Sequence, residues 1–503
     1  MSASADTAPG SSTWRRIFKL KLWHEHFTED KMARRISVLL LISTAAFAGN
    51  PQYNEWFANT TLRIDYYHTG TATTELYSLD ALYEEGQWPG RRTLLLDTLN
   101  VGSNLACVYD QEKGTLIFST SYCTVFNEWQ STTEAIAENR RTMHETIRIP
   151  MPLKPIRLEI KRRDRQNHFI AGWSVDINPI SRSINREKNP YSWQVHPIEH
   201  HGDPDDQVDI VILGDGYSRD DLGKLRADAE RYSRVLFNCE PFKSRLKDFN
   251  VWLIESVSAE SGIDEPDRDL WRSTAVGASY NTFDTPRYVL TMENRDMRDI
   301  AALAPYDVIY ILFNSPRYGG GGIYNQFATC YTGAENGEPE WWSDYVFVHE
   351  FGHSFAALAD EYYTSDVAYN NLYPLDVEPW EVNITTLNAA GGPKWSSLLT
   401  PQVKIPTPWH KEQYDSLSSR AYRYSGDASQ AKAERDAARI QMENILVTPD
   451  CAAVVGCFEG AGYASSGIYR SAINCRMFSK SLVEFCPVCR KAIEEMISFS
   501  IGK

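Results

Sequence analysis

The sequence predicts a protein of the α/β (α+β) class, in which a small antiparallel β-sandwich precedes a larger domain built on a parallel sheet. Two observations support this prediction. Short apolar runs separated by turn residues fill residues 50–180, and a β-α-β pattern marks the start of the second domain, residues 195–503. Short strands with frequent turns favour a sandwich, whereas continuous apolar strands alternating with helices favour a buried parallel sheet.

Length and charge narrow the range of functions. The chain has 503 residues, enough for two or three domains, and 43% of them are hydrophobic, as in ordinary globular proteins. The formal net charge at pH 7 is −15. A nucleic acid or an anionic membrane would require a concentrated basic patch, so neither is expected as a partner. The composition indicates no oligomeric state.

Residues 32–48 have the features of a secretory signal peptide. Basic residues precede a short apolar run that ends in Ala46-x-Ala48. The run is well short of the roughly 20 residues that a membrane span needs. We therefore expect residues 1–31 to be an upstream extension, cleavage near Ala48, and a mature chain that begins at Gly49 without a membrane span. Such a chain would be secreted or periplasmic.

The first domain, residues 50–180, is expected to contain seven short strands. Turn signals such as Trp88-Pro89-Gly90 separate the apolar runs. Two roles are considered for this domain: it could bind substrate, or it could have a passive role in packing or folding. The predicted strands are 62–67, 93–96, 107–109, 115–118, 147–150, 156–160 and 169–175.

The second domain, residues 195–503, follows a linker near residues 178–207. Four consecutive glycines at 319–322 are expected to permit a tight excursion before an edge strand at 326–332, which would hold an extended substrate. A polar stretch at about 364–450 is expected to form a loop-rich insert. The predicted regular elements are strands at 208–213, 251–257 and 306–313 and helices at 219–237 and 431–444.

A His-Glu-x-x-His pattern lies in an apolar helical segment. His349 and His353 are four residues apart, so on a helix both imidazoles project from one face and can bind one Zn²⁺. Glu350 can then act as a general base on a water molecule whose pKa zinc lowers to about 7. Chance histidines on a surface helix are the alternative for the bare pattern. Because the flanking valines and phenylalanines predict a buried helix, unsatisfied histidines there would be costly, and we expect one catalytic zinc.

A third protein ligand would leave one coordination position open for water. Asp360 is the first candidate and Glu361 the alternative. In an unbroken helix Asp360 would lie about 16 Å along the axis from His349, which is too far to share an ion. We therefore expect the chain to break near residues 356–358 and turn back. The carboxylate that does not bind the metal would orient a histidine N–H.

The helix motif resembles that of the metzincins, His-Glu-x-x-His-x-x-Gly-x-x-His or Asp. Ala356 occupies the glycine position and Ala359 the third-ligand position, one residue before Asp360. The segment Cys475-Arg-Met477 resembles the metzincin Met-turn, which implies that Met477 forms a hydrophobic floor under the zinc. Ordinary core packing is the alternative for this methionine.

Together with the glycine-rich residues 458–463 and the pattern Cys475-x-Met477-x8-Cys486-x-x-Cys489, the helix motif resembles the bacterial IgA metallopeptidase family over roughly residues 50–503. The resemblance implies a metzincin-like zinc endopeptidase that acts on proteins or peptides, and it does not establish IgA as the substrate.

Several metzincins carry a tyrosine two residues after the Met-turn methionine, where this chain has Ser479. This leaves Tyr463 and Tyr469 as candidate oxyanion stabilisers, with packing as their alternative role.

The chain has nine cysteines. Cys107 and Cys123 are expected on one hairpin and could pair. Cys486 and Cys489 have the spacing of a metal knuckle or a tight disulfide, and with Cys475 they are candidate structural cysteines. Disulfides are favoured, because an exported protein meets an oxidising compartment. Archaeal metzincins use similar cysteines for a second, structural zinc, but the sequence does not reveal a matching fourth ligand here.

Three hypotheses about function follow from these motifs. The first is a secreted zinc endopeptidase that hydrolyses peptide bonds of extracellular (glyco)proteins with Glu350 as general base. The second is a catalytically quiet module that binds protein or glycan; an intact Glu350 disfavours it, since pure binding needs no base beside a metal. The third is a zinc amidase or aminopeptidase, which differs in whether the cleft accepts an extended chain on both sides of the metal.

Overall fold

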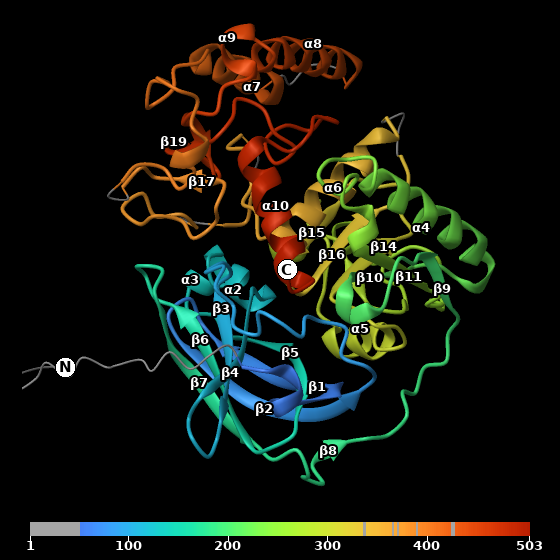
Figure 1. Ribbon diagram of the computed structural model, residues 1–503. Coiled ribbons are helices and arrows are strands. Elements are labelled where there is room, and N and C mark those ends of the chain that lie inside the picture. Colours follow the sequence, from blue (N-terminus) through green and yellow to red (C-terminus); the bar gives the residue numbers. More distant parts are fainter. Residues whose placement is uncertain (1–50, 335–338, 365–366, 370–371, 389–390, 424–427) are drawn as a thin grey trace, which may run out of the picture. The chain divides into compact units, whose positions relative to one another are not determined.

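The computed structural model describes residues 51–334, 339–364, 367–369, 372–388, 391–423 and 428–503 (Figure 1). The predicted signal peptide and upstream extension lie outside these residues. Within them, no helix is both long enough and apolar enough to cross a membrane.

Two four-stranded sheets form the N-terminal part of the described chain and share one apolar core. The first sheet has the order β5-β1-β2-β8, and the second has the order β4-β3-β6-β7. Side chains from both sheets contribute to this core, such as Ile64 of β1 and Val108 of β3, which are fully buried. The strands are β1 Phe57–Gly70, β2 Glu75–Glu85, β3 Asn104–Asp110, β4 Leu116–Tyr122, β5 Arg141–Pro152, β6 Ile156–Arg163, β7 Phe169–Ile177 and β8 Ile184–Asn185. Three short helices accompany them: α1 Tyr53–Trp56, α2 Val125–Trp129 and α3 Thr133–Ile136.

A six-stranded sheet with the order β15-β16-β14-β10-β11-β9 follows. The four inner strands run parallel and the two edge strands antiparallel. Alternate residues of β10 explain why all of it is buried: Ile210 and Ile212 face the side that carries helices α4 and α6, whereas Val211 and Leu213 face α5. The elements are β9 Val195–Glu199, β10 Val208–Asp215, α4 Leu222–Leu236, β11 Phe249–Ile254, β12 Ala278–Ser279, β13 Leu290–Thr291, α5 Asn294–Ala301, β14 Val308–Phe313, β15 Gly320–Ile323, β16 Phe327–Tyr331 and α6 Trp341–Ala356.

The sequence predicts an edge strand at residues 326–332, and the edge position is wrong. Those residues form β16, an inner strand, and the glycines themselves form the edge strand β15. The two strands are joined by a tight turn in which Asn325 has a left-handed φ of 54°. The outer edge of Gly320 is already paired, because its N–H donates to Arg287 and its carbonyl accepts from Val289.

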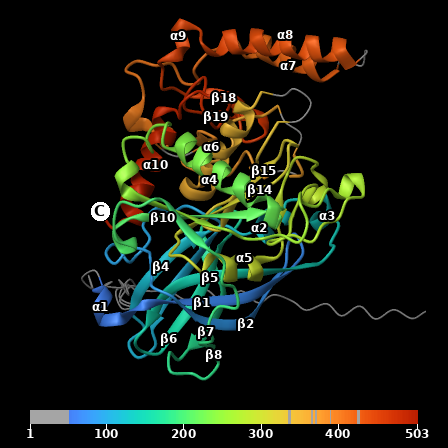
Figure 2. The same ribbon diagram turned by 90° about the vertical axis from the view of Figure 1, so that its right-hand side faces the viewer.

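The remaining residues combine loops, a three-stranded sheet and four helices in the described ranges. The predicted helix at 431–444 lies within α8, whereas α7 has no counterpart in the sequence-based prediction. Helices α7 and α8 lie side by side in both views (Figure 1 and Figure 2). The elements are β17 Ile384–Thr385, α7 Lys411–Arg423, α8 Ala428–Leu446, α9 Pro449–Ala452, β18 Phe458–Ala461, β19 Ala464–Arg470 and α10 Pro487–Ser500.

All nine cysteines are free, so the predicted disulfides are wrong for this structure. Cys107 and Cys123 do not pair because the register of the two strands does not place them opposite one another. Cys107 lies opposite Ser119 in the β3–β4 pair, whereas the Sγ of Cys123 accepts a hydrogen bond from the N–H of Ser103 at 3.4 Å. The two thiols are therefore several residues apart along the hairpin.

Candidate metal centre

Helix α6, which carries both histidines, ends at Ala356, and the chain turns back there. Ala357 adopts a left-handed φ of 54° at the helix end. Its N–H donates to the carbonyl of His353 at 3.1 Å, and the N–H of Leu358 donates to that of Gly352 at 3.3 Å. Such paired bonds satisfy the last carbonyls of a helix and reverse the chain. The reversal brings Asp360 back beside the helix.

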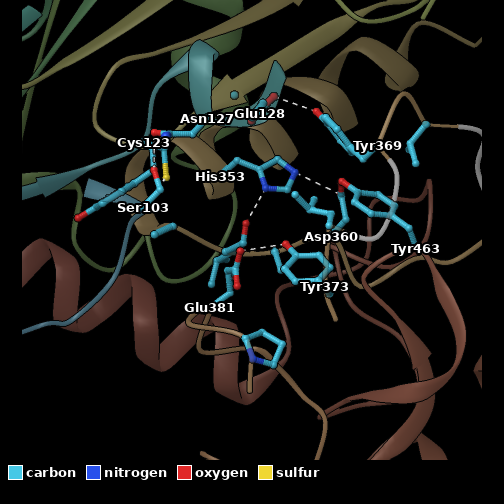
Figure 3. A pocket seen from close by; sticks show the side chains of 18 of the residues that line it. Ser103, Cys123, Asn127, Glu128, His353, Asp360, Tyr369, Tyr373, Glu381 and Tyr463 are labelled. Atoms are coloured by element: carbon cyan, nitrogen blue, oxygen red, sulfur yellow. Dashed lines mark hydrogen bonds and ion pairs between the residues drawn. The ribbon is translucent and has the colours of Figure 1, made fainter. Parts of the chain in front are cut away.

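Three acceptor atoms converge at this turn. The Nε2 atoms of His349 and His353 are 3.1 Å apart, and the Oδ1 atom of Asp360 lies 3.0 Å from the first and 3.2 Å from the second. Tetrahedral zinc with ligand bonds of about 2.0–2.1 Å would separate neighbouring ligand atoms by about 3.3 Å. The triangle therefore has the size that three ligands of one zinc ion require. Figure 3 shows His353 and Asp360 directed toward one another.

The opposite ring nitrogens fix the orientation of the imidazoles. Nδ1 of His349 lies 3.1 Å from the carbonyl oxygen of Arg476, and Nδ1 of His353 lies 2.6 Å from that of Leu358. A carbonyl oxygen can only accept, so each Nδ1 carries the proton and donates it. In a neutral ring Nε2 then presents its lone pair, which is the form that binds a metal.

The electrostatics of the group favour a cation at its centre. Burial alone would raise the pKa of Asp360, but the two imidazoles outweigh burial and hold it well below its ordinary value. Burial alone would lower the pKa of His353, but the charge of Asp360 outweighs it and raises that pKa to about 9. For Glu350, which lies between these histidines in sequence, burial raises the pKa above its ordinary value. A metal that binds here would displace a proton from the histidine pair.

A tyrosine holds the other oxygen of the carboxylate. The hydroxyl of Tyr463 donates to Oδ2 of Asp360 at 2.5 Å, so Oδ1 is left to face the histidines (Figure 3). Tyr463 follows β18 and adopts a left-handed φ of 65°. The other tyrosine named from the sequence, Tyr469, lies on β19 and does not line the cleft.

Comparisons with known proteins identify the family. The model of the family described as IgA peptidase M64 matches residues 196–497, which is more than half of the chain. The chain belongs to the IgA peptidase M64 family. The model of the M64 peptidase N-terminus matches residues 52–174, the region of the two four-stranded sheets. A comparison with curated protein sequences found no match.

Membership in the M64 family supports a peptidase with protein or peptide substrates. In this M64 peptidase Met477 is fully buried beneath α6. A Cβ atom at Gly352 would come within 3.0 Å of its Sδ atom, so the absence of a side chain at Gly352 lets the helix rest on the thioether. The methionine thus packs under the helix that carries both histidines.

The glycines of β15 approach the same helix from the sheet. A Cβ atom at Gly322 would lie 2.5 Å from the carbonyl oxygen of Glu350 and 3.0 Å from Cβ of His353. A Cβ atom at Gly320 would lie 3.3 Å from Cγ of Glu350. Only glycine permits this approach of backbone to helix. The glycine run therefore positions α6 against the sheet.

The cleft that His349, His353 and Asp360 line has a volume of about 370 Å³. Its walls come from three parts of the chain: the N-terminal domain, the segment before β15, and the region after α6. Glu128 of α2 belongs to the first wall and accepts hydrogen bonds from Tyr288 and, at 2.8 Å, from Tyr369 (Figure 3). Burial raises the pKa of Glu128 to about 7. Sequence reasoning missed Glu128 because no local pattern places a residue of the first domain at the cleft of the second.

Glu361, the alternative third ligand, is directed elsewhere. Its carboxylate contacts the thiols of Cys486 and Cys489, away from the two histidines. The carboxylate that meets the imidazoles is that of Asp360.

Proposed function

We propose that this M64 peptidase is a secreted zinc endopeptidase. The observation that supports the proposal is the convergence of Nε2 of His349, Nε2 of His353 and Oδ1 of Asp360 within about 3 Å of one another, on the floor of a cleft that Glu350 also lines. Two nitrogens, one carboxylate oxygen and an open side toward the cleft match the donor set of a catalytic zinc site. Met477 would support the helix from below.

Each residue then has a defined role. Zinc, when bound, would polarise the scissile carbonyl and acidify water. Glu350, with a pKa raised by burial, would accept a proton from the attacking water and later deliver it to the nitrogen of the departing amine, as the C–N bond breaks. Tyr463 would hold Asp360 in position rather than contact the oxyanion, because its hydroxyl is bonded to that carboxylate.

The substrate class follows from family membership and from the predicted export. An M64 peptidase acts on proteins or peptides, and the signal-peptide features of residues 32–48 would direct the enzyme to extracellular proteins or glycoproteins. N-terminal sequencing of secreted material should begin at Gly49. A mature protein that retains residues 1–31 would contradict export by this signal.

The decisive experiment compares the wild type with Glu350→Gln on peptides blocked at both ends. The variant should keep its zinc and its fold, whereas hydrolysis should fall by about 10²–10⁴-fold because the general base is gone. Glu340→Gln is the matched control, because Glu340 is exposed at the start of the same helix. Chelation should abolish the activity of the wild type, and added zinc should restore it.

The outcomes separate the alternatives. Hydrolysis of peptides with a free N-terminus and a blocked C-terminus, but not of doubly blocked ones, would indicate an aminopeptidase. Absence of hydrolysis in zinc-loaded wild type, on a broad peptide mixture, would favour a binding module. Equal activity of Glu350→Gln and wild type would remove Glu350 from the chemistry.

A further inference from the structure

A second group of ligand-type side chains lies behind the candidate catalytic site. Cys475, Cys486, Cys489 and Glu361 are all buried, and their sulfur and carboxylate atoms lie within 4.8 Å of one another. The Sγ atoms of Cys475 and Cys489 are 3.7 Å apart. Oε1 of Glu361 lies 3.1 Å from Sγ of Cys489 and 3.9 Å from Sγ of Cys486.

These separations match a tetrahedral site. Zinc bonds of about 2.3 Å to sulfur and about 2.0–2.2 Å to oxygen give sulfur–sulfur separations of about 3.8 Å and sulfur–oxygen separations of about 3.5 Å. The observed 3.7 Å corresponds to the first, and the observed 3.1 and 3.9 Å lie on either side of the second. A disulfide would need a sulfur–sulfur distance of about 2.05 Å. One disulfide would also leave the third thiol and the carboxylate without a role.

The carboxylate of Glu361 has one oxygen atom without a hydrogen-bond donor among the described contacts. Its Oε2 atom is fully buried and has no hydrogen-bond partner, while Oε1 accepts from Nδ2 of Asn383 at 3.1 Å. A buried carboxylate that lacks a full set of donors is costly unless a cation neutralises its charge, and a cation bound at Oε1, the oxygen nearest the thiols, would neutralise the whole group. Three thiols and a carboxylate can ionise together only if a metal replaces their protons.

Backbone donors are already directed at the sulfurs. The N–H of Cys486 donates to Sγ of Cys475 at 3.2 Å, and the N–H of Cys489 donates to Sγ of Cys486 at 3.5 Å. Cys486 is also the N-cap of α10, a helix of 14 residues, and the N-terminus of a helix favours a thiolate. The hydroxyl of Ser471 lies 3.2 Å from the same sulfur.

We propose that Glu361, Cys475, Cys486 and Cys489 bind a second Zn²⁺, in a closed structural site. Thiolates select a soft metal such as zinc over magnesium or calcium. All four ligands come from the protein and are buried, which leaves no open position for a water or a substrate. The role of this ion is therefore to hold the chain together rather than to react.

The proposed site joins three segments that the catalytic site needs. Glu361 directly follows Asp360, Cys475 precedes Met477 by two residues, and Cys486 and Cys489 begin α10, which packs against α6. An ion here would fix the turn that carries Asp360 relative to the loop that carries Met477. We expect its loss to weaken binding of the catalytic zinc as well.

Metal analysis of a variant that lacks the catalytic ligands tests this proposal independently of the proposed activity. The full chain with His349→Ala and His353→Ala, purified with zinc and a reductant, should contain about one zinc ion per chain, against about two in the wild type. Addition of Cys486→Ser should remove that ion. Cys107→Ser, a buried thiol in β3 outside the cluster, is the matched control and should retain it.

Cobalt supplies a readout that does not depend on the cysteine variant folding. The double histidine variant loaded with Co²⁺ should show thiolate-to-cobalt charge-transfer absorption in the near ultraviolet, together with the intense visible d–d bands of a tetrahedral site. Glu361→Gln should weaken cobalt binding while leaving this band detectable. A folded double histidine variant that holds no zinc and gives no such band would overturn the proposal, as would a disulfide among Cys475, Cys486 and Cys489 in freshly reduced and refolded wild type supplied with zinc.

Discussion

The N–H of Glu361 donates to the carbonyl oxygen of Met477 at 2.8 Å. The preceding carbonyl, that of Arg476, accepts from Nδ1 of His349 at 3.1 Å. Two consecutive peptide groups of one loop therefore bond to the helix that carries the first candidate ligand and to the segment that carries the third, Asp360. The loop therefore connects the two halves of the site, in addition to the hydrogen bonds of the left-handed turn.

Tyr463→Phe should weaken zinc binding without changing the fold. The substitution removes the only hydroxyl that donates to Oδ2 of Asp360 among the contacts described, and loss of such an outer partner typically lowers metal affinity by about 10–100-fold. Competition with a chromogenic chelator measures the affinity. Tyr469→Phe, the same change on β19 outside the cleft, should leave it unchanged. Equal affinities in both variants would contradict the role given to Tyr463.

Gly322→Ala should destabilise the protein and disturb the site together. The new Cβ would lie 2.5 Å from the carbonyl oxygen of Glu350, so β15 and α6 must separate. Overpacking of this kind typically costs about 1–3 kcal/mol, which denaturant unfolding can measure. We also expect a lower rate of hydrolysis, since Glu350 and His353 would shift.

The control for this change is Gly223→Ala in α4. A Cβ atom there meets no other atom within 4 Å, so the substitution should be neutral or stabilise the helix by about 0.5–1 kcal/mol. If Gly322→Ala were as stable and as active as Gly223→Ala, the close packing of β15 on α6 would not be a constraint.

The stability of the N-terminal domain should depend on pH through His68. The imidazole is fully buried; its Nδ1 lies 3.1 Å from Glu145 and its Nε2 lies 3.4 Å from Glu75. Burial lowers the pKa of His68, but the two carboxylates outweigh burial and raise it from 6.5 to about 8. A raised pKa means that the folded state binds the proton more tightly than the unfolded state does. The resulting stabilisation, about 2 kcal/mol, is complete below pH 6.5 and is lost as the pH rises to about 8.

His68→Gln should abolish this loss of stability between pH 6.5 and 8. The measurement is the free energy of unfolding against pH for the variant and the wild type. His168→Gln is the control, because the side chain of His168 is 78% exposed and should not alter the profile. An unchanged profile in His68→Gln would show that the carboxylates do not hold the proton on His68.

Local sequence determined the part of the site that lies on one helix. The spacing of His349 and His353 places both rings on one face because helical periodicity needs no distant contact, and the limited reach of that helix indicated a break, which the structure has at Ala357. The apolar runs of β10 and β14 likewise predicted buried parallel strands, since both faces of such strands are covered.

Only the tertiary structure decided which distant residues meet. The hydrogen bond between Glu128 and Tyr369 joins residues 241 apart in the sequence, and the contact of Glu361 with Cys489 joins residues 128 apart. No local periodicity encodes such contacts, because they depend on how two domains pack and on the path of the chain after α6. The sequence therefore left Glu361 as an alternative ligand of the first metal, whereas the fold directs its carboxylate to the cysteines.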